Sequence, residues 1–241
     1  MELDGYPTVT KALASTISRS GGWRAWEQKA QSIEDLDDRE KMYRKGLTLH
    51  PEAAELFGRF ALFLGDELEN LKEAKLYFAK ALEIEPDYPG NTNAEGYLAI
   101  CDGKYPEAQQ KLELALLFNQ NRKNDIALGV NLNLAILALL NSESQDSYLA
   151  EIASLIEGGV VCKYWTFDLL LKYISGHVQT AELTFYESVV NGVCGTLDAK
   201  DSALAIRNRI ASAKKIEEIA EKSNSKKSGR KTSKRKKKEA E

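Results

Sequence analysis

The chain has 241 residues, of which 43% are hydrophobic, and this supplies enough apolar material for one extended domain or two small ones. Its five prolines and 16 glycines are few, which favours a helical protein over a many-turned β sandwich or barrel. The net charge of −3 hides an asymmetry, because residues 222–241 hold ten Lys or Arg and two Glu, a net of +8, on an otherwise acidic chain.

Membrane insertion, disulfide bonding and metal binding are not expected. The first residues contain no apolar segment like that of a signal peptide, and the most apolar run, Ile126 to Leu140, is too short to span a bilayer and carries two asparagines. Three cysteines at wide spacing, Cys101, Cys162 and Cys194, suit neither a disulfide framework nor a zinc site. We therefore expect a soluble protein without metal or cofactor, in the cytoplasm, or in the nucleus if its source is eukaryotic.

After an N-terminal segment over 1–21, the chain repeats a pattern of two helices. Ala74 and Ala108 occupy the same place in two copies that lie 34 residues apart (108 − 74 = 34). In the best-preserved copy, apolar residues recur at three- and four-residue steps until Pro86 ends the helix. The predicted second helices are, in chain order, Asp38–Pro51, Leu71–Pro86, Tyr105–Gln120 and Val178–Val190.

The helix before each of these carries a bulky residue early and ends at a glycine. The segment Asn93–Gly103 ends five residues before Ala108, and the predicted helix Cys162–Gly176 ends five residues before Ala181. Between them, residues 125–158 leave room for one degenerate copy that has the apolar helix pair without the marker residues. The repeats together are expected to cover residues 22–195, in about four to five units.

At these positions the unit resembles the tetratricopeptide repeat. The matching residues are the early aromatics Trp23 and Trp165; the pair Phe57-Gly58 and the glycine Gly96; the turn glycines Gly65, Gly103 and Gly176; the first alanines Ala74, Ala108 and Ala181; the second aromatics Tyr43, Phe78 and Phe185; the second alanines Ala81 and Ala115; and the prolines Pro51 and Pro86. The aromatic pairs near Trp23 and Phe57 are also similar to the half-a-TPR repeats of RNA-processing scaffolds, a second possibility.

The resemblance implies an all-α, right-handed superhelix of stacked helix pairs, whose first helices line a concave groove that binds a protein or peptide partner. On this frame, the groove candidates are Arg24, Gln28, Arg59, Asn93, Tyr97, Lys163 and Tyr173. Amides and arginines suit backbone carbonyls and carboxylates, and tyrosines suit stacking. The alternative for each is an ordinary solvated surface residue.

After the repeats, residues 196–222 are expected to form a helix that covers the last apolar face of the stack. Asp201 or Ser202 is the predicted N-cap, and the apolar stripe consists of Ala203, Leu204, Ile206, Ile210, Ala213, Ile216 and Ile219. A solenoid needs such a cap at its end. An exposed stripe that pairs with a partner is the alternative.

The final segment, residues 223–241, is rich in Lys and Arg and is expected to be disordered, because the stretch from Lys226 to Lys238 contains no apolar residue. It has three possible roles: a solubilising end, a non-specific contact with nucleic-acid phosphates, or a nuclear import signal. The candidates for the last two roles are Lys234, Arg235, Lys236, Lys237 and Lys238. No aromatic residues interleave with these charges, so base stacking is not expected.

No pattern typical of an enzyme is present. The two histidines, His50 and His177, fall in predicted turns between helices and are not tied by spacing to a nucleophile. A phosphate loop and a zinc-protease motif are also missing. The sequence therefore predicts a non-catalytic scaffold or adaptor that binds a protein or peptide, with a nucleic-acid-associated factor tethered by the basic tail as the alternative.

Overall fold

The computed structural model describes residues 22–120, 122–162, 165 and 167–215, and these form helices without any strand. In chain order the helices are α2 (Gly22–Gln31), α3 (Leu36–Leu49), α4 (Ala54–Asp66), α5 (Leu71–Ile84), α6 (Pro89–Cys101), α7 (Tyr105–Phe118), α8 (Asp125–Leu140), α9 (Asp146–Glu157), α10 (Asp168–Ser175) and α11 (Thr180–Cys194), and another helix follows over 199–215. The predicted all-α class is confirmed.

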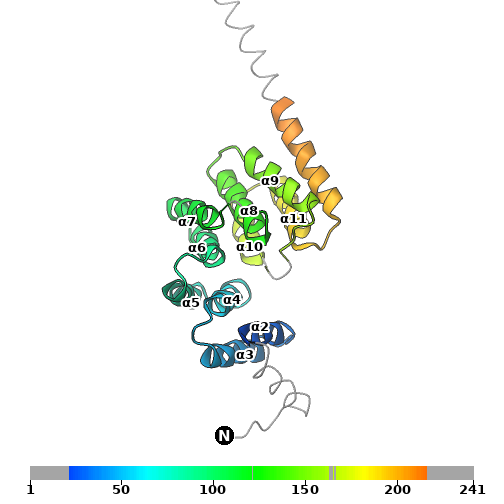
Figure 1. Cartoon of the computed structure of the whole chain (residues 1–241). Helices are drawn as coiled ribbons and strands as arrows, with labels where there is room; N and C mark the ends of the chain where they lie inside the picture. Colours follow the sequence, from blue (N-terminus) through cyan, green and yellow to red (C-terminus); the bar gives the residue numbers. More distant parts are fainter. Residues whose placement is uncertain (1–21, 121, 163–164, 166, 216–241) are drawn as a thin grey trace, which may run out of the picture.

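Consecutive helices pack as the pairs α2–α3, α4–α5, α6–α7, α8–α9 and α10–α11. The first helices of the first four pairs also contact one another in sequence, α2 on α4, α4 on α6 and α6 on α8. Figure 1 shows these four pairs following one another from the N-terminal end of the described chain. Because each pair covers the apolar face of its neighbour, one continuous core runs through the stack from Ala30 in α2 to Ile206 in the helix over 199–215.

Local sequence explains where the helices begin and how closely they pack. The Asn70 side chain accepts a hydrogen bond from the backbone N–H of Glu73 at the start of α5, and Asn124 caps α8 in the same way through Ala127. Within α6, a Cβ on Gly96 would lie 2.7 Å from the Leu112 side chain, so glycine lets α6 and α7 approach closely.

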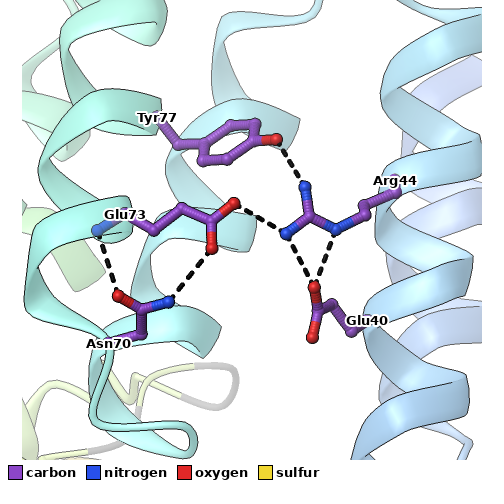
Figure 2. Close-up of polar contacts among 5 residues, drawn as sticks. All are labelled: Glu40, Arg44, Asn70, Glu73 and Tyr77. Atoms are coloured by element: carbon purple, nitrogen blue, oxygen red, sulfur yellow. Dashed lines mark hydrogen bonds and ion pairs between the residues drawn. The ribbon is translucent and has the colours of Figure 1, made fainter.

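A polar network joins the second helices of the first two pairs, as Figure 2 shows. The Arg44 guanidinium on α3 donates hydrogen bonds to Glu40 at 2.7 Å, to Glu73 at 2.7 Å and to the Tyr77 hydroxyl at 2.8 Å. Asn70 donates to the other oxygen of Glu73 at 3.0 Å. The guanidinium thus connects α3 to α5, and also lies 5.1 Å from the centre of the Phe60 ring of α4.

The last pair differs from its prediction. A first helix was expected over 162–176, but α10 covers only Asp168–Ser175, and the described residues just before it, Trp165 and Phe167, are not helical. Instead of standing beside α8 as a full helix, α10 packs on α6 and α4 as well as on α11. The prediction is wrong because burial of these two aromatic side chains against distant helices overrides the local helical pattern.

The helix over 199–215 packs on the end of the stack. Ala203 and Ile206 are buried, and Arg207 donates to both carboxylate oxygens of Glu157 in α9, at 2.8 and 2.5 Å. Two details of the prediction are wrong. Asp198 caps the helix, through the backbone N–H of Lys200, and Leu204 is exposed, because that side of the helix faces away from α11. Residues 1–21 and 216–241, including Ile216, Ile219 and the basic tail, lie outside the described residues.

Candidate functional site

The first helices of the first four pairs, α2, α4, α6 and α8, are called the inner helices below. Each contributes one polar side chain to what we call the polar row, whose members are Glu27, Arg59, Asn93 and Asn133. They make two direct pairs. Arg59 Nε lies 3.0 Å from Glu27 Oε1, and Asn133 Nδ2 donates to Asn93 Oδ1 at 3.0 Å. A stack that only had to bury apolar surface would place aliphatic residues here, so a row of polar groups indicates a face with another role.

The Glu27–Arg59 end of the row is mostly buried and rich in charge, with 11% of the Glu27 side chain and 21% of the Arg59 side chain exposed. Burial raises the pKa of Glu27, and the positive charges of Arg59 and Arg24 oppose this shift. Burial also raises the pKa of Glu55, whose carboxylate lies 3.8 Å from Arg24. Two arginines and two carboxylates therefore share the part of the face between α2 and α4, and Arg24 is its most exposed member, with 71% of its side chain accessible.

The Asn93–Asn133 end is fully buried, with both residues at 0% exposure. Their single mutual hydrogen bond leaves Asn93 Nδ2 and Asn133 Oδ1 without a hydrogen-bond partner among the described residues. If the O and N atoms of both amides exchanged places, Asn93 would donate to Asn133, and the unpaired atoms would be the Asn93 oxygen and the Asn133 nitrogen. In either orientation the two side chains present one free donor and one free acceptor.

Trp165 covers the middle of the row. The Arg59 guanidinium lies 5.7 Å from the centre of its indole ring, and a Cβ on Gly129 of α8 would lie 3.0 Å from the ring and 3.4 Å from Asn93 Nδ2. The indole is only 9% exposed, yet its Nε1 also has no hydrogen-bond partner in the described part of the chain. Glycine at 129 is what lets the ring reach α8 beside the amides.

Phe167 and α10 continue this cover over α4 and α6. Phe167 stacks on Trp165 with ring centres 6.3 Å apart, and meets Tyr97 edge-on at 6.4 Å. The Tyr97 hydroxyl donates to Asp66 of α4, and burial, with this carboxylate second, raises its pKa. At the other end of α10, Lys172 lies 2.5 Å from Glu69 and the Tyr173 hydroxyl lies 3.0 Å from that of Tyr105.

These positions correct part of the predicted groove. Arg24 and Gln28 are exposed and Arg59 is half-buried, so these three lie on or beside the accessible end of the row. The expectation that Asn93 and Tyr97 face outward is wrong, because Trp165, Phe167 and α10 pack over them. Tyr173 belongs to α10, the covering helix, and Lys163 lies outside the described residues.

The sequence interpretation missed Glu27, Asn133 and the role of Trp165. One signal was available for Asn133. The chain has an Asn-x-Asn pattern at Asn91–Asn93 and again at Asn131–Asn133, inside its most apolar run, and all four asparagines are buried. Amide side chains at the same spacing in two buried neighbouring helices indicate that they form hydrogen bonds with each other across the helix interface. Trp165 gave no such signal, because it fits the early aromatic of a repeat.

The histidines and cysteines give no reactive cluster. His50 and His177 follow helix ends, as predicted, and the His177 ring stacks on Tyr173 at 4.4 Å. Burial raises the pKa of the Cys162 thiol, and it raises that of Cys194 to about 11, so both favour the protonated form. Within the described ranges no three His, Cys, Asp or Glu side chains gather in a way that suits a metal ion, and no helix there is long and apolar enough to cross a bilayer.

Membership of the tetratricopeptide-repeat family remains a prediction from the repeat pattern. No protein-family model matches the sequence, and no curated protein matches it significantly.

Proposed function

We propose that the chain is a non-catalytic protein-interaction scaffold of the tetratricopeptide type, and that its polar row binds the backbone of an extended peptide when the residues that cover Asn93 and Asn133 move aside. The observation that supports this is the free donor and free acceptor of the buried Asn93–Asn133 pair. A peptide group presents one C=O and one N–H, which is the complement of these two side chains.

Burial of the two amides favours binding of a ligand that can pair with them. A polar atom that is buried without a partner costs about 1–3 kcal/mol, so a ligand that satisfies both amides recovers a large part of that cost on binding. The neighbouring Arg59 and Arg24 add a place for a carboxylate of the partner, where a charge-assisted hydrogen bond competes with Glu27 and Glu55. The face thus combines backbone recognition with charge selection.

The test uses peptides selected from a displayed random library against the full chain. We expect selected peptides to lose affinity by about tenfold or more on Asn93→Leu and Asn133→Leu chains, because leucine has a similar size and no hydrogen-bonding group. A chain that carries both replacements should retain the fold and show the same loss of affinity, because replacing both partners of a buried polar pair with apolar groups of similar shape is nearly neutral.

Asn131→Leu is the matched control. Asn131 lies on the same helix and is also buried, but its amide donates to the backbone carbonyl of Ala127 at 2.8 Å, within α8. Its replacement should leave peptide affinity unchanged. Peptides that bind the Asn93→Leu and Asn133→Leu chains as tightly as the wild type would exclude the polar row as the binding site.

A second candidate function, association with nucleic acid, is favoured by the net charge of +8 over residues 222–241. Lys and Arg that neutralise phosphates release counterions, which gives affinity without sequence selection. Under this alternative the helical stack organises a complex while the tail, with Lys234 to Lys238, attaches it to RNA or DNA. Deletion of the tail separates the two functions.

A further inference from the structure

We infer that Trp165, Phe167 and α10, together the covering segment, act as an internal ligand of the polar row, and that the partner is a peptide with two aromatic residues separated by one residue, which binds by displacing this segment. The inference rests on the proposed function and adds the chemistry of the partner and the state of the free chain.

The covering segment lies across earlier repeats. It comes from the fifth helix pair, yet α10 packs on the first helices of the second and third pairs, α4 and α6. This is the inner side of the stack, where Arg59 and the Asn93–Asn133 pair lie. A segment that reaches back across earlier repeats occupies the surface on which a partner of those repeats would lie.

The covering segment leaves polar atoms of this surface without hydrogen-bond partners among the described residues. Buried polar atoms are nearly always paired in native proteins. Asn93 Nδ2, Asn133 Oδ1 and Trp165 Nε1 are all unpaired within the described residues, and both Trp165 and Asn93 Nδ2 lie next to Gly129 of α8. The aromatic rings fill the space, but none of the described backbone groups of the covering segment makes a hydrogen bond with Asn93 Nδ2 or Asn133 Oδ1. A ligand with the same aromatic side chains and a differently placed backbone would satisfy both.

A short helix forms most of the covering segment. The α10 helix has eight residues, and it follows a connection that includes Gly159 with a φ of +81°. Its Lys172–Glu69 ion pair is exposed on both sides, at 64% and 60%, so it contributes little. Its stronger anchors are apolar: Phe167, Leu170 and Ile174 are each exposed by 1% or less, so a peptide that displaces the segment has to fill the same apolar places.

The chemistry of the internal ligand defines that of the partner. One aromatic ring lies over the Arg59 guanidinium, at 5.7 Å, and the ring two residues later lies between Trp165 and Tyr97. A peptide that carries aromatic residues at this spacing can make both contacts and also supply a C=O and an N–H to the amides. The apparent affinity of such a peptide equals its intrinsic affinity multiplied by the fraction of chains in which the face is uncovered.

The experiment measures binding of a fluorescent peptide with the sequence of residues 160–175, VVCKYWTFDLLLKYIS, to the full chain. We expect the Trp165→Ala chain to bind it about tenfold more tightly than the wild-type chain, because the internal competitor is weakened. A peptide in which Trp and Phe are replaced by Ala should not bind. A Leu112→Ala chain, altered in the buried core of α7, controls for general destabilisation and should bind like the wild type.

A second measurement covers the case in which Trp165→Ala prevents folding. In the wild-type chain, saturating peptide should accelerate hydrogen exchange of the α10 amides and leave those of α5 unchanged, since only the covering segment is displaced. Equal affinity for wild-type and Trp165→Ala chains, no binding to either, or binding without faster α10 exchange would overturn the inference. Library peptides that depend on Asn93 but lack paired aromatics would overturn it too, while leaving the proposed function intact.

Discussion

Glu27 and Arg59 show how burial and pairing oppose each other at a single site. The carboxylate is 3.0 Å from the guanidinium, which favours its charged form, yet loss of solvent is the larger effect and the pKa of Glu27 is raised. A carboxyl with a raised pKa in the folded chain binds its proton more tightly there than in the unfolded chain. The stability that the protonated Glu27 carboxyl gives the folded chain is therefore fully present at pH values below the unfolded pKa, near 4.5. It is lost as the pH rises through the pKa of Glu27 in the folded chain.

The Glu27→Gln variant tests this sign. Glutamine keeps the size and a hydrogen-bond acceptor for Arg59 but does not ionise. We expect the melting temperature of the wild type, relative to that of the variant, to decrease as the pH rises from about 4 to 7. Thermal melts of the two chains in matched buffers give this difference directly, and a difference that increases with pH would show that pairing with Arg59 outweighs burial.

At the scale of elements, the stack is held together by apolar packing within pairs and by a few polar links between them. The Arg44 network joins α3 to α5, and it connects second helices, whereas the polar row belongs to the first helices. Its partners are partly exposed, so solvent screening reduces the value of each ion pair. The network therefore serves mainly to fix the position of the first pair relative to the second.

Replacing Arg44 with Met should lower the free energy of unfolding by about 1 kcal/mol, because three hydrogen bonds are lost while the side chain stays long enough to cover Phe60. Chemical denaturation measures the change. Lys41→Met is the control on the same helix, since its exposed ion pair with Asp38 lies within α3 and the effect should stay within about 0.5 kcal/mol. Equal losses in the two variants would show that the network adds nothing beyond surface charge.

The helix over 199–215 depends on a close approach to α11. A Cβ on Gly192 would overlap the buried Ser202 side chain at its Cβ, so the two backbones have to separate if this glycine is replaced. Arg209 reinforces the contact, with its guanidinium 4.3 Å from the centre of the Phe185 ring and 2.5 Å from Glu182. Gly192 is thus the position at which the terminal helix is most easily dislodged.

Gly192→Ala should lower the free energy of unfolding by about 1–3 kcal/mol through overpacking, in spite of the better helix propensity of alanine. Hydrogen exchange over 199–215 should increase at the same time. Gly176→Ala is the matched control, because its φ of −84° suits alanine and nothing lies nearer than 3.8 Å to the added atom. If both variants are as stable as the wild type, the terminal helix does not pack tightly on α11.

At the scale of the whole molecule, charge divides the chain into two parts with different expected roles. Residues 1–221 carry 23 positive and 34 negative charges, a net of −11, and residues 222–241 carry +8 (33 − 10 = 23; 36 − 2 = 34). An acidic body repels nucleic acid, so any affinity for it has to come from the tail. Peptide binding on the polar row is independent of this division.

Deletion of residues 222–241 should abolish binding to a single-stranded oligonucleotide and leave the melting temperature and peptide affinity unchanged. In the full chain, oligonucleotide affinity should fall steeply between about 50 and 200 mM salt, because several counterions are released on binding. Fluorescence anisotropy at a series of salt concentrations gives both results. Undiminished binding after deletion would place the nucleic-acid contact on the helical body.

The sequence by itself determined the helix pairs, their order and most of their boundaries. Apolar residues at three- and four-residue steps, small residues such as Ala74 and Ala81, and stops such as Pro86 are local signals, and the pairs α4–α5 and α6–α7 follow them closely. The charge of the tail is also a property of sequence alone. These features depend on residues that lie near one another along the chain.

Only the tertiary structure decided which inner residues are accessible. Asn93 and Tyr97 were predicted to face a groove, but a segment about 70 residues later returns across α4 and α6 and covers them (165 − 93 = 72). Periodicity reports which side of a helix faces its neighbour and carries no information about a distant segment that packs on the other side. The same long-range contact turned Trp165 from a predicted helix residue into the cover of the polar row, because burying its ring gains more free energy than continuing the helix.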